Sequence, residues 1–309
     1  MQGELVVKQG NGVVTRAIGP WQVRCSSWQE TVSTVQASEL ATVLRAWQQV
    51  FSKEGTFAQT EFNTPSLLVR VDCAPSNSGL GIYEVEERPA GVGIAAAVNA
   101  GFATRLAVWR LTVPEFKVVV SPRRGEPGTD DYLWCPVAET DYLGLVLVRS
   151  EPDETEFHHL ASRSISSIRT KGDKSYGVPL GWWREARSFE RLPWQEGFCL
   201  KPCQGSKCRG VHVFPPKTSR PGGKAGSGAS TKSQVERALE VAGRMYLQPY
   251  QPPLRRELEG LEYRVIWRLF FGFEPAKKSW IPLGGIWTGR ASSFRIHGSS
   301  DSLSGPLVV

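Results

Sequence analysis

Apolar and polar residues alternate along short stretches in the first half of the chain, which is the pattern of strands with one buried face. These stretches include GVVTRAIG at 12–19, WQVRCSSW at 21–28, SLLVRVDCA at 66–74 and GIYEVEE at 81–87. A helical spacing replaces the alternation at 38–55, where Ser38 is a suitable N-cap and Gly55 a suitable stop signal. A second helical pattern covers 93–109. Because strands alternate with helices, we expect an α/β layer with parallel strand pairing.

The pattern changes near residues 150–165, where the acidic segment EPDETE follows the last strand of the first half. Beyond it, the expected strands are FCLKPC, GVHVFP, RMYLQPY, YRVIWRLFFGF and WIPLGGIWTGR, with one helix at TKSQVERALEVAGRM. Glycine and proline turns between these strands favour antiparallel partners. We therefore expect an N-terminal α/β domain over residues 1–155 and a second domain over 156–309, in a chain of mixed α/β and α+β class.

The positive charge of the chain is concentrated in one region. The net charge is +7, but residues 163–232 hold fourteen Lys or Arg against four Asp or Glu, a local excess of +10. This concentration predicts a polyanionic partner, either nucleotide phosphates or a nucleic-acid backbone. A solvated basic face is the alternative interpretation.

The sequence has no run of roughly 18 apolar residues, and its first residues lack a basic flank followed by an apolar run. We therefore expect a cytoplasmic protein with no membrane partner. Its six cysteines are sparse and unevenly spaced, so free thiols are expected rather than a disulfide framework.

The stretch FCLKPCQGSKCRGVHVF at 198–214 carries the clearest chemistry. A lysine at a strand end can neutralise a phosphate, and a glycine-containing turn lets backbone N–H groups approach polyphosphate closely. Lys201 and the turn 204–210 would then form a phosphate clamp. A β-hairpin with a basic tip has the same composition and remains the alternative.

The order of this stretch and its neighbours resembles the ATP-grasp superfamily. The upstream match is KGDKSYGVPLGWW at 171–183, and the downstream matches are YLQPY at 246–250 and EYRVIWRLFFGF at 262–273. The resemblance implies an ATP-grasp-like fold preceded by an α/β domain, with ATP bound by Lys174, Lys201, Gly205, Ser206, Lys207, Gly210, Gln248, Tyr250 and Glu262. It also implies that Arg264 and Arg290, with Arg268 nearby, hold a carboxylate or an acyl phosphate.

Two shorter resemblances bear on substrates and metal. GIYEVEERPAGVG at 81–93 is similar to a turn in glutathionylspermidine-synthase-like proteins. Its Glu84, Glu86 and Arg88 would suit a substrate amine and carboxylate, and a plain strand-to-helix turn is the alternative. The end of the chain from Arg290 resembles ribosomal-protein glutamate-ligase-like enzymes, but no Glu-x-Asn metal pair follows. Hard cations need carboxylate oxygens, so magnesium (Mg²⁺) ligation is expected from Glu262, Asp301 or an acid in the N-terminal half. The alternative is a protein that binds nucleotide with little turnover.

Other constellations compete with this interpretation. GSGASTKS at 226–233 has Thr231 where a P-loop needs its second glycine, so a P-loop is rejected. Cys199, Cys203, Cys208 and His212 offer four possible zinc ligands at unusual spacing. His158 and His159 lack a nearby nucleophile pattern, which leaves hydrolase chemistry without support. Trp182, Trp183 and Trp194 in the basic region would allow stacking on bases, although packing is the commoner fate of tryptophan.

The expected function is therefore an ATP-dependent ligase that joins a small-molecule carboxylate to an amine or peptide through an acyl phosphate. Two alternatives stay open: a non-catalytic ATP-grasp-like nucleotide-binding protein, and a basic nucleic-acid-binding protein. The sequence is compatible with a homo-oligomer and does not identify either substrate.

Overall fold

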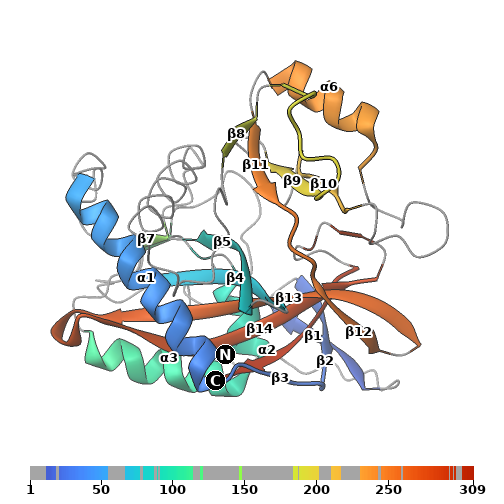
Figure 1. Ribbon diagram of the computed structural model, residues 1–309. Coiled ribbons are helices and arrows are strands. Elements are labelled where there is room, and N and C mark those ends of the chain that lie inside the picture. Colours follow the sequence, from blue (N-terminus) through green and yellow to red (C-terminus); the bar gives the residue numbers. More distant parts are fainter. Residues whose placement is uncertain are drawn as a thin grey trace.

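A large, mostly antiparallel β-sheet dominates the computed structural model, and a smaller sheet lies to one side of it (Figure 1). The structure describes residues 12–18, 21–54, 67–76, 79–86, 89, 91–113, 119–120, 146–147, 184–186, 188–201, 210–216, 230–242, 245–258, 260–291, 293–294, 296 and 301–309. Mixed α and β content was expected from the sequence and is confirmed. Among the described residues, no helix combines the length and apolar character needed to cross a membrane.

The large sheet has nine strands, seven of them in the order β1-β2-β15-β14-β13-β4-β5, while β12 pairs with β13 and β3 with β15. Their bounds are β1 Val13–Ile18, β2 Trp21–Ser26, β3 Glu30–Thr31, β4 Leu68–Ser76, β5 Gly79–Glu86, β12 Leu254–Leu258, β13 Leu261–Glu274, β14 Ser279–Arg290 and β15 Leu303–Val308. A 3₁₀ turn, η5 (Pro275–Lys277), joins the two longest strands. Strands from both sides of residue 155 therefore share one sheet, while the expected domain boundary itself stays a prediction.

The parallel pairing expected in the first half is wrong within the large sheet and holds for one short pair outside it. β1 pairs with β2, and β4 with β5, in antiparallel hairpins, and β13 then adds to β4 antiparallel as well. Within the large sheet the described parallel pairs are those of β15 with β2 and β3. A separate short parallel pair joins β6 (Val119–Val120) to β7 (Val146–Leu147). The hairpins form because only a few residues separate their strands, which leaves no room for a helical crossover.

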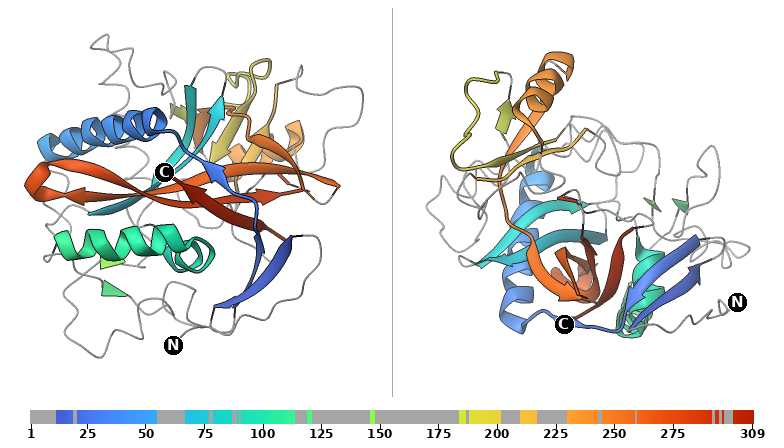
Figure 2. Two further views of the ribbon diagram at one scale, coloured as in Figure 1. Left: turned by 90° about the horizontal axis from the view of Figure 1, so that it is seen from below. Right: turned by 90° about the vertical axis from the view of Figure 1, so that its right-hand side faces the viewer.

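Helices cover both faces of the large sheet (Figure 2). Helix α1 (Thr34–Glu54) packs Leu40 and Leu44 against one face, while α2 (Val92–Val98) and α3 (Ala100–Thr112) cover part of the other. The burial of these apolar faces is the main stabilising contribution, at roughly 25 cal/mol per Å² of apolar surface.

Helix α1 begins one turn before the expected N-cap Ser38. Ser33 Oγ accepts from the backbone N–H of Gln36 at 3.2 Å, and Gln36 Oε1 accepts from the backbone N–H of Ser33 at 3.0 Å. This reciprocal pair is a capping box, which satisfies two N–H groups at the helix start. Ser38 lies within the helix instead, so that expectation was wrong, while the helix ends at Glu54, directly before the expected stop Gly55.

The predicted helix at 93–109 is divided at Asn99. The Asn99 side-chain oxygen accepts from the backbone N–H of Phe102 and caps α3. Its Nδ2 donates to the carbonyls of Gly285 and Leu307 at 2.8 and 2.9 Å. One buried amide thus starts a helix and ties it to β14 and β15.

The smaller sheet has the order β10-β9-β11-β8 and is antiparallel throughout. Its strands are β8 Arg184–Ala186, β9 Phe198–Lys201, β10 His212–Phe214 and β11 Met245–Pro249, and helix α6 (Lys232–Ala242) belongs to the same unit. One face carries Phe198, Leu200 and Leu247, which pack with Val235 and Leu239 of α6. The other face is left for polar residues.

Candidate functional site

Strand β13 has one apolar face and one face that carries charge. Tyr263, Val265 and Trp267 pack in the core beneath α1. Because side chains alternate along a strand, Arg264 and Arg268 lie on the opposite face. The candidate site is built on that face, where β4, β5 and β14 continue the sheet.

The most buried part of the site is an ion pair on β4. Arg70 Nε donates to Asp72 Oδ1 at 2.6 Å, and Arg70 NH2 donates to Asp72 Oδ2 at 3.0 Å. Their side chains are 4% and 3% exposed. Bidentate geometry of this kind is the strongest form of an arginine–carboxylate contact.

Strand register extends this pair into a network. Asp72 lies opposite Glu84 of β5 on one side and opposite Arg268 of β13 on the other. Glu84 Oε1 is 3.6 Å from Arg70 NH2, and Arg268 Nε is 3.7 Å from Asp72 Oδ2. Burial raises the pKa of the Asp72 carboxyl, whereas the two guanidinium groups favour the carboxylate and lower it.

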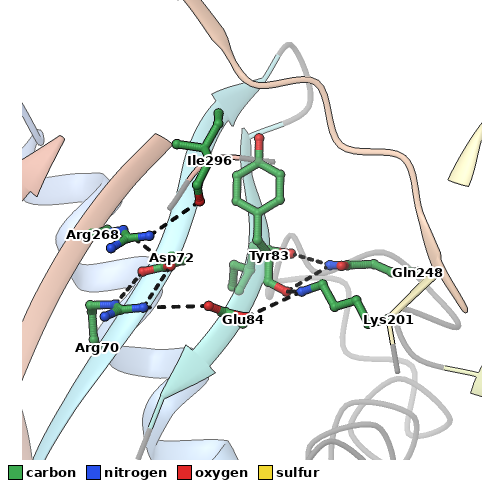
Figure 3. Close-up of polar contacts among 9 residues, drawn as sticks. Arg70, Asp72, Tyr83, Glu84, Lys201, Gln248, Arg268 and Ile296 are labelled. Atoms are coloured by element: carbon green, nitrogen blue, oxygen red, sulfur yellow. Dashed lines mark hydrogen bonds and ion pairs between the residues drawn. The ribbon is translucent and has the colours of Figure 1, made fainter. Parts of the chain in front are cut away.

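The small sheet meets this network through two side chains (Figure 3). Lys201 Nζ donates to the Tyr83 carbonyl at 3.1 Å and lies 3.5 Å from Glu84 Oε2. Gln248 Nε2 donates to the carbonyls of Ile82 and Tyr83, both at 3.1 Å. We call Arg70, Asp72, Glu84, Lys201 and Arg268 the charge cluster.

Lys201 reaches the cluster because strand β9 is amphipathic. Phe198 and Leu200 are buried under α6, so Cys199 and Lys201 point to the other face. Gln248 lies opposite Cys199 in the register of β11 and β9. Burial raises the pKa of the half-buried Cys199 thiol to about 11, an effect that the Lys201 cation opposes.

A second group of charges lies farther along β13. Arg264 is opposite Arg255 of β12 on one side and opposite Arg290 of β14 on the other. We call these three residues the arginine row. Arg264 and Arg268 are four residues apart on one strand, or about 13 Å. Three cations side by side on one face form an attractive site for an anion.

Aromatic residues border the arginine row. The Arg264 guanidinium lies 4.0 Å from the ring centroid of Phe294, and Tyr250 meets the same ring edge-on at 6.5 Å. Burial lowers the pKa of Arg264. Burial also raises the pKa of Tyr250, while the Arg255 and Arg264 cations lower it. The hydroxyl of Tyr250 is thus a neutral hydrogen-bonding group at neutral pH.

The structure brings several predicted site residues together. Lys201 and Gln248 touch the same carbonyl, and Arg264 and Arg290 are direct neighbours with Tyr250 close by. Gly210 lies in an exposed turn before β10 with a positive φ of 69°, which suits glycine. The predicted residues Lys174, Gly205, Ser206 and Lys207 lie outside the described residues, as do Glu87 and Arg88 of the 81–93 motif.

The two expected metal ligands are each paired with an arginine. Glu262 Oε2 is 3.4 Å from Arg255 NH1, and Asp301 Oδ2 accepts from Arg290 Nε at 3.0 Å. Across the described ranges, no three His, Cys, Asp or Glu side chains gather closely enough to hold an ion. As placed, these two carboxylates do not fit a shared magnesium site.

The zinc site and the base-stacking tryptophans, the two competing expectations, each include residues that the structure describes. Cys199 is a free thiol, whereas Cys203 and Cys208 of the zinc alternative lie outside the described residues. Trp194 packs against Phe198 and Phe214 at centroid distances of 5.0 and 4.8 Å. It therefore has the packing role, while Trp182 and Trp183 lie outside the described ranges.

Sequence reasoning missed the buried pair Arg70 and Asp72. The signal was present, because SLLVRVDCA places two charges of opposite sign two residues apart in an apolar strand. Such charges share one face and are almost never buried unless they are paired. The pattern therefore predicts a buried ion pair on β4.

No protein-family model matches this chain, and a search of curated proteins finds no match.

Proposed function

We propose that the protein is an ATP-dependent carboxylate–amine ligase of ATP-grasp-like type. The observation that carries the proposal is the position of Lys201. Its side chain is 13% exposed and projects from the small sheet against Glu84 and the Tyr83 carbonyl of the large sheet. A largely buried cation between two sheets, beside an arginine-rich face, suits a polyphosphate that enters between them.

Each group has a distinct part in the proposed reaction. Lys201 neutralises a phosphate of ATP, and Gln248 and Tyr250 lie on the segment 247–250 that the resemblance assigns to the nucleotide. The arginine row holds the substrate carboxylate and then the acyl phosphate. Its positive charge stabilises the negative charge that moves onto the transferred phosphoryl group.

The chemistry proceeds in two displacements. A carboxylate oxygen of the substrate attacks the γ-phosphorus, the bond to the β–γ bridging oxygen breaks, and ADP leaves. The nitrogen of a neutral amine then attacks the acyl carbon, the bond to phosphate oxygen breaks, and the nitrogen loses a proton as the amide forms. Overall a carboxylate, an ammonium ion and ATP give an amide, ADP, phosphate and one proton. Glu262 and Asp301, the carboxylates expected to hold magnesium, are instead paired with arginines.

The test compares two lysine variants. Mg·ATP should raise the melting temperature of the wild type. Lys201→Met should abolish that shift, because the variant lacks the cation that binds a phosphate of ATP. Lys277→Met is the matched control, since Lys277 is also paired with a glutamate but is 68% exposed at the η5 turn. Equal ATP-dependent shifts in wild type and Lys201→Met would overturn the proposed role of Lys201.

A second candidate is a nucleotide-binding protein that does not turn over. The pairing of Glu262 with Arg255 and of Asp301 with Arg290 favours it. Phosphate release measured with and without a pool of amino acids separates the two candidates. Release that depends on an amine supports the ligase, and ATP-dependent stabilisation without release supports the binding protein. If ATP has no effect on the folded protein, the basic region 163–232 points to a nucleic-acid partner, with affinity that falls steeply with salt.

A further inference from the structure

The ammonium group of Lys201 occupies a pair of oxygen acceptors on strand β5. It donates to the Tyr83 carbonyl at 3.1 Å and lies 3.5 Å from Glu84 Oε2 (Figure 3). We call the Tyr83 carbonyl and the Glu84 carboxylate the ammonium site. The side chain of Glu84 is 29% exposed, which makes it the most accessible of the charge cluster. It contacts Arg70 and Lys201.

Lys201 would serve two incompatible partners in the proposed reaction. The long lysine side chain can reach either the carboxylate of Glu84 or a nucleotide phosphate, and a dense polyphosphate charge is the stronger competitor. When Lys201 turns to phosphate, Glu84 and the carbonyl of Tyr83 lose an ammonium ion. A partly buried carboxylate that loses a cation is destabilised until another cation replaces it.

We propose that the ammonium site binds the primary ammonium group of the amine substrate after nucleotide has drawn Lys201 away. The inference rests on the proposed function and adds to it the location of the amine and the class of amine. A primary ammonium has three N–H donors and fits the acceptors that Lys201 now uses. A quaternary ammonium has the same charge but no donor, so it does not fit.

Gln248 keeps the site in place during this exchange. The residue is 1% exposed, and its side chain donates to the carbonyls of Ile82 and Tyr83. These two bonds fix the backbone of β5 independently of Lys201. The Tyr83 carbonyl therefore keeps its position when its contact with the lysine is broken.

The exchange couples the two substrates thermodynamically. A nucleotide that removes Lys201 from the ammonium site raises the affinity for the amine, and the amine must raise the affinity for nucleotide by the same factor. Couplings of this kind are typically between about 5-fold and 150-fold. The bound ammonium group must lose a proton before its nitrogen can attack the acyl carbon. The carboxylate of Glu84, which binds the ammonium group, is the nearest proton acceptor.

The first arm of the experiment tests the site without nucleotide. Lys201→Ala removes the built-in ammonium group, so ethylammonium should stabilise this variant at concentrations at which tetramethylammonium, at equal ionic strength, does not. Adding Glu84→Gln to Lys201→Ala should abolish the difference between the two ions. Adding Glu236→Gln, an exposed glutamate of α6, should leave it unchanged. Equal responses to both ions in Lys201→Ala would overturn the ammonium site.

The second arm uses the wild type, so the inference remains testable if Lys201→Ala does not fold. The affinity for ethylammonium is measured with and without saturating nucleotide by calorimetry. We expect affinity that is about tenfold higher with nucleotide in the wild type and unchanged in Glu84→Gln. Nucleotide binding without any change in amine affinity would refute the exchange while leaving the proposed function intact. If nucleotide does not bind at all, the proposed function and the exchange both fall.

Discussion

Arg264 of β13 lies directly opposite Arg290 of β14, so two guanidinium groups of like charge are neighbours on one face of the sheet. Like charges placed opposite each other across a strand pair are destabilising. The arrangement is relieved by Asp301 at Arg290 and would be relieved further by a bound anion. The arginine row is therefore expected to respond to anions more than its surroundings do.

Replacing Arg264 should separate anion binding from stability. In Arg264→Gln we expect the free energy of unfolding without ligand to change by no more than about 1 kcal/mol, because repulsion by Arg290 and Arg255 offsets the lost contact with Phe294. Stabilisation by inorganic phosphate should fall in this variant. Phosphate titrations followed by thermal unfolding measure both, with Arg237→Gln, at an exposed position of α6, as the control. If phosphate stabilises Arg264→Gln as much as the wild type, the arginine row is not part of the anion-binding site.

Breaking the Arg70–Asp72 pair on one side should be strongly destabilising. We expect Asp72→Asn to lower the free energy of unfolding by about 3–5 kcal/mol, because it takes the closest counter-charge from a guanidinium that is 4% exposed. The double variant Arg70→Met, Asp72→Leu should recover much of this loss, since it removes both buried charges. Denaturant unfolding of Arg70→Met, Asp72→Leu and the double variant completes the cycle. A purely additive result would contradict a coupled pair.

The capping box at the start of α1 predicts that Ser33, rather than Ser38, stabilises the helix. Ser33→Ala should lower the free energy of unfolding by about 1 kcal/mol, because it removes the acceptor for the Gln36 N–H. Ser38→Ala should have little effect or stabilise slightly, because Ser38 is an exposed residue inside the helix. Chemical denaturation of both variants in parallel decides the position of the cap. A larger loss in Ser38→Ala would restore the position expected from the sequence.

The Cys199 thiol should report on the state of Lys201. Since its pKa is raised from 9.0 to about 11, its alkylation rate should reach half of its maximum near pH 11 rather than near pH 9. Lys201→Met should shift this profile to still higher pH, because the lysine cation lowers the thiol pKa. Mass mapping of iodoacetamide-treated peptides gives the profile for this cysteine alone. A half-maximal rate near pH 9 would show that burial does not raise the pKa of this thiol.

The same shift has a consequence for stability at alkaline pH. A thiol whose folded pKa exceeds its unfolded pKa stabilises the fold below pH 9, and that contribution is lost as the pH rises through about 11. Cys199→Ser should therefore weaken the decline in the free energy of unfolding over this window.

Local features of the fold follow well from the sequence, whereas partner choice does not. The stretch YRVIWRLFFGF at 263–273 was expected to form a strand and lies in β13, and the helical spacing before Gly55 predicted the body of α1. The pairing of β4 with β13 joins residues about 200 positions apart, which periodicity does not encode. The start of α1 was encoded, because Ser33 and Gln36 form an S-x-x-Q pattern, but a second serine at Ser38 competed with it.

The candidate site divides in the same way. Lys201 and Gln248 stand out through their motif, and the arginines of β13 and β14 through their charge within apolar strands. Which of them become neighbours depends on strand register, which places Arg264 beside Arg290 and Asp72 beside Glu84. Register is set by packing on both faces of the sheet, so no short motif reveals it.

The two-faced character of β13 constrains how the length of the chain can vary. Inserting or deleting one residue between Tyr263 and Trp267 would exchange the faces of the strand beyond that point. It would turn Arg268 toward the apolar layer under α1 and expose a core tryptophan in its place. Changes of length are therefore expected to be tolerated at the Pro275–Lys277 turn and eliminated by selection within the strand, however conservative the inserted residue.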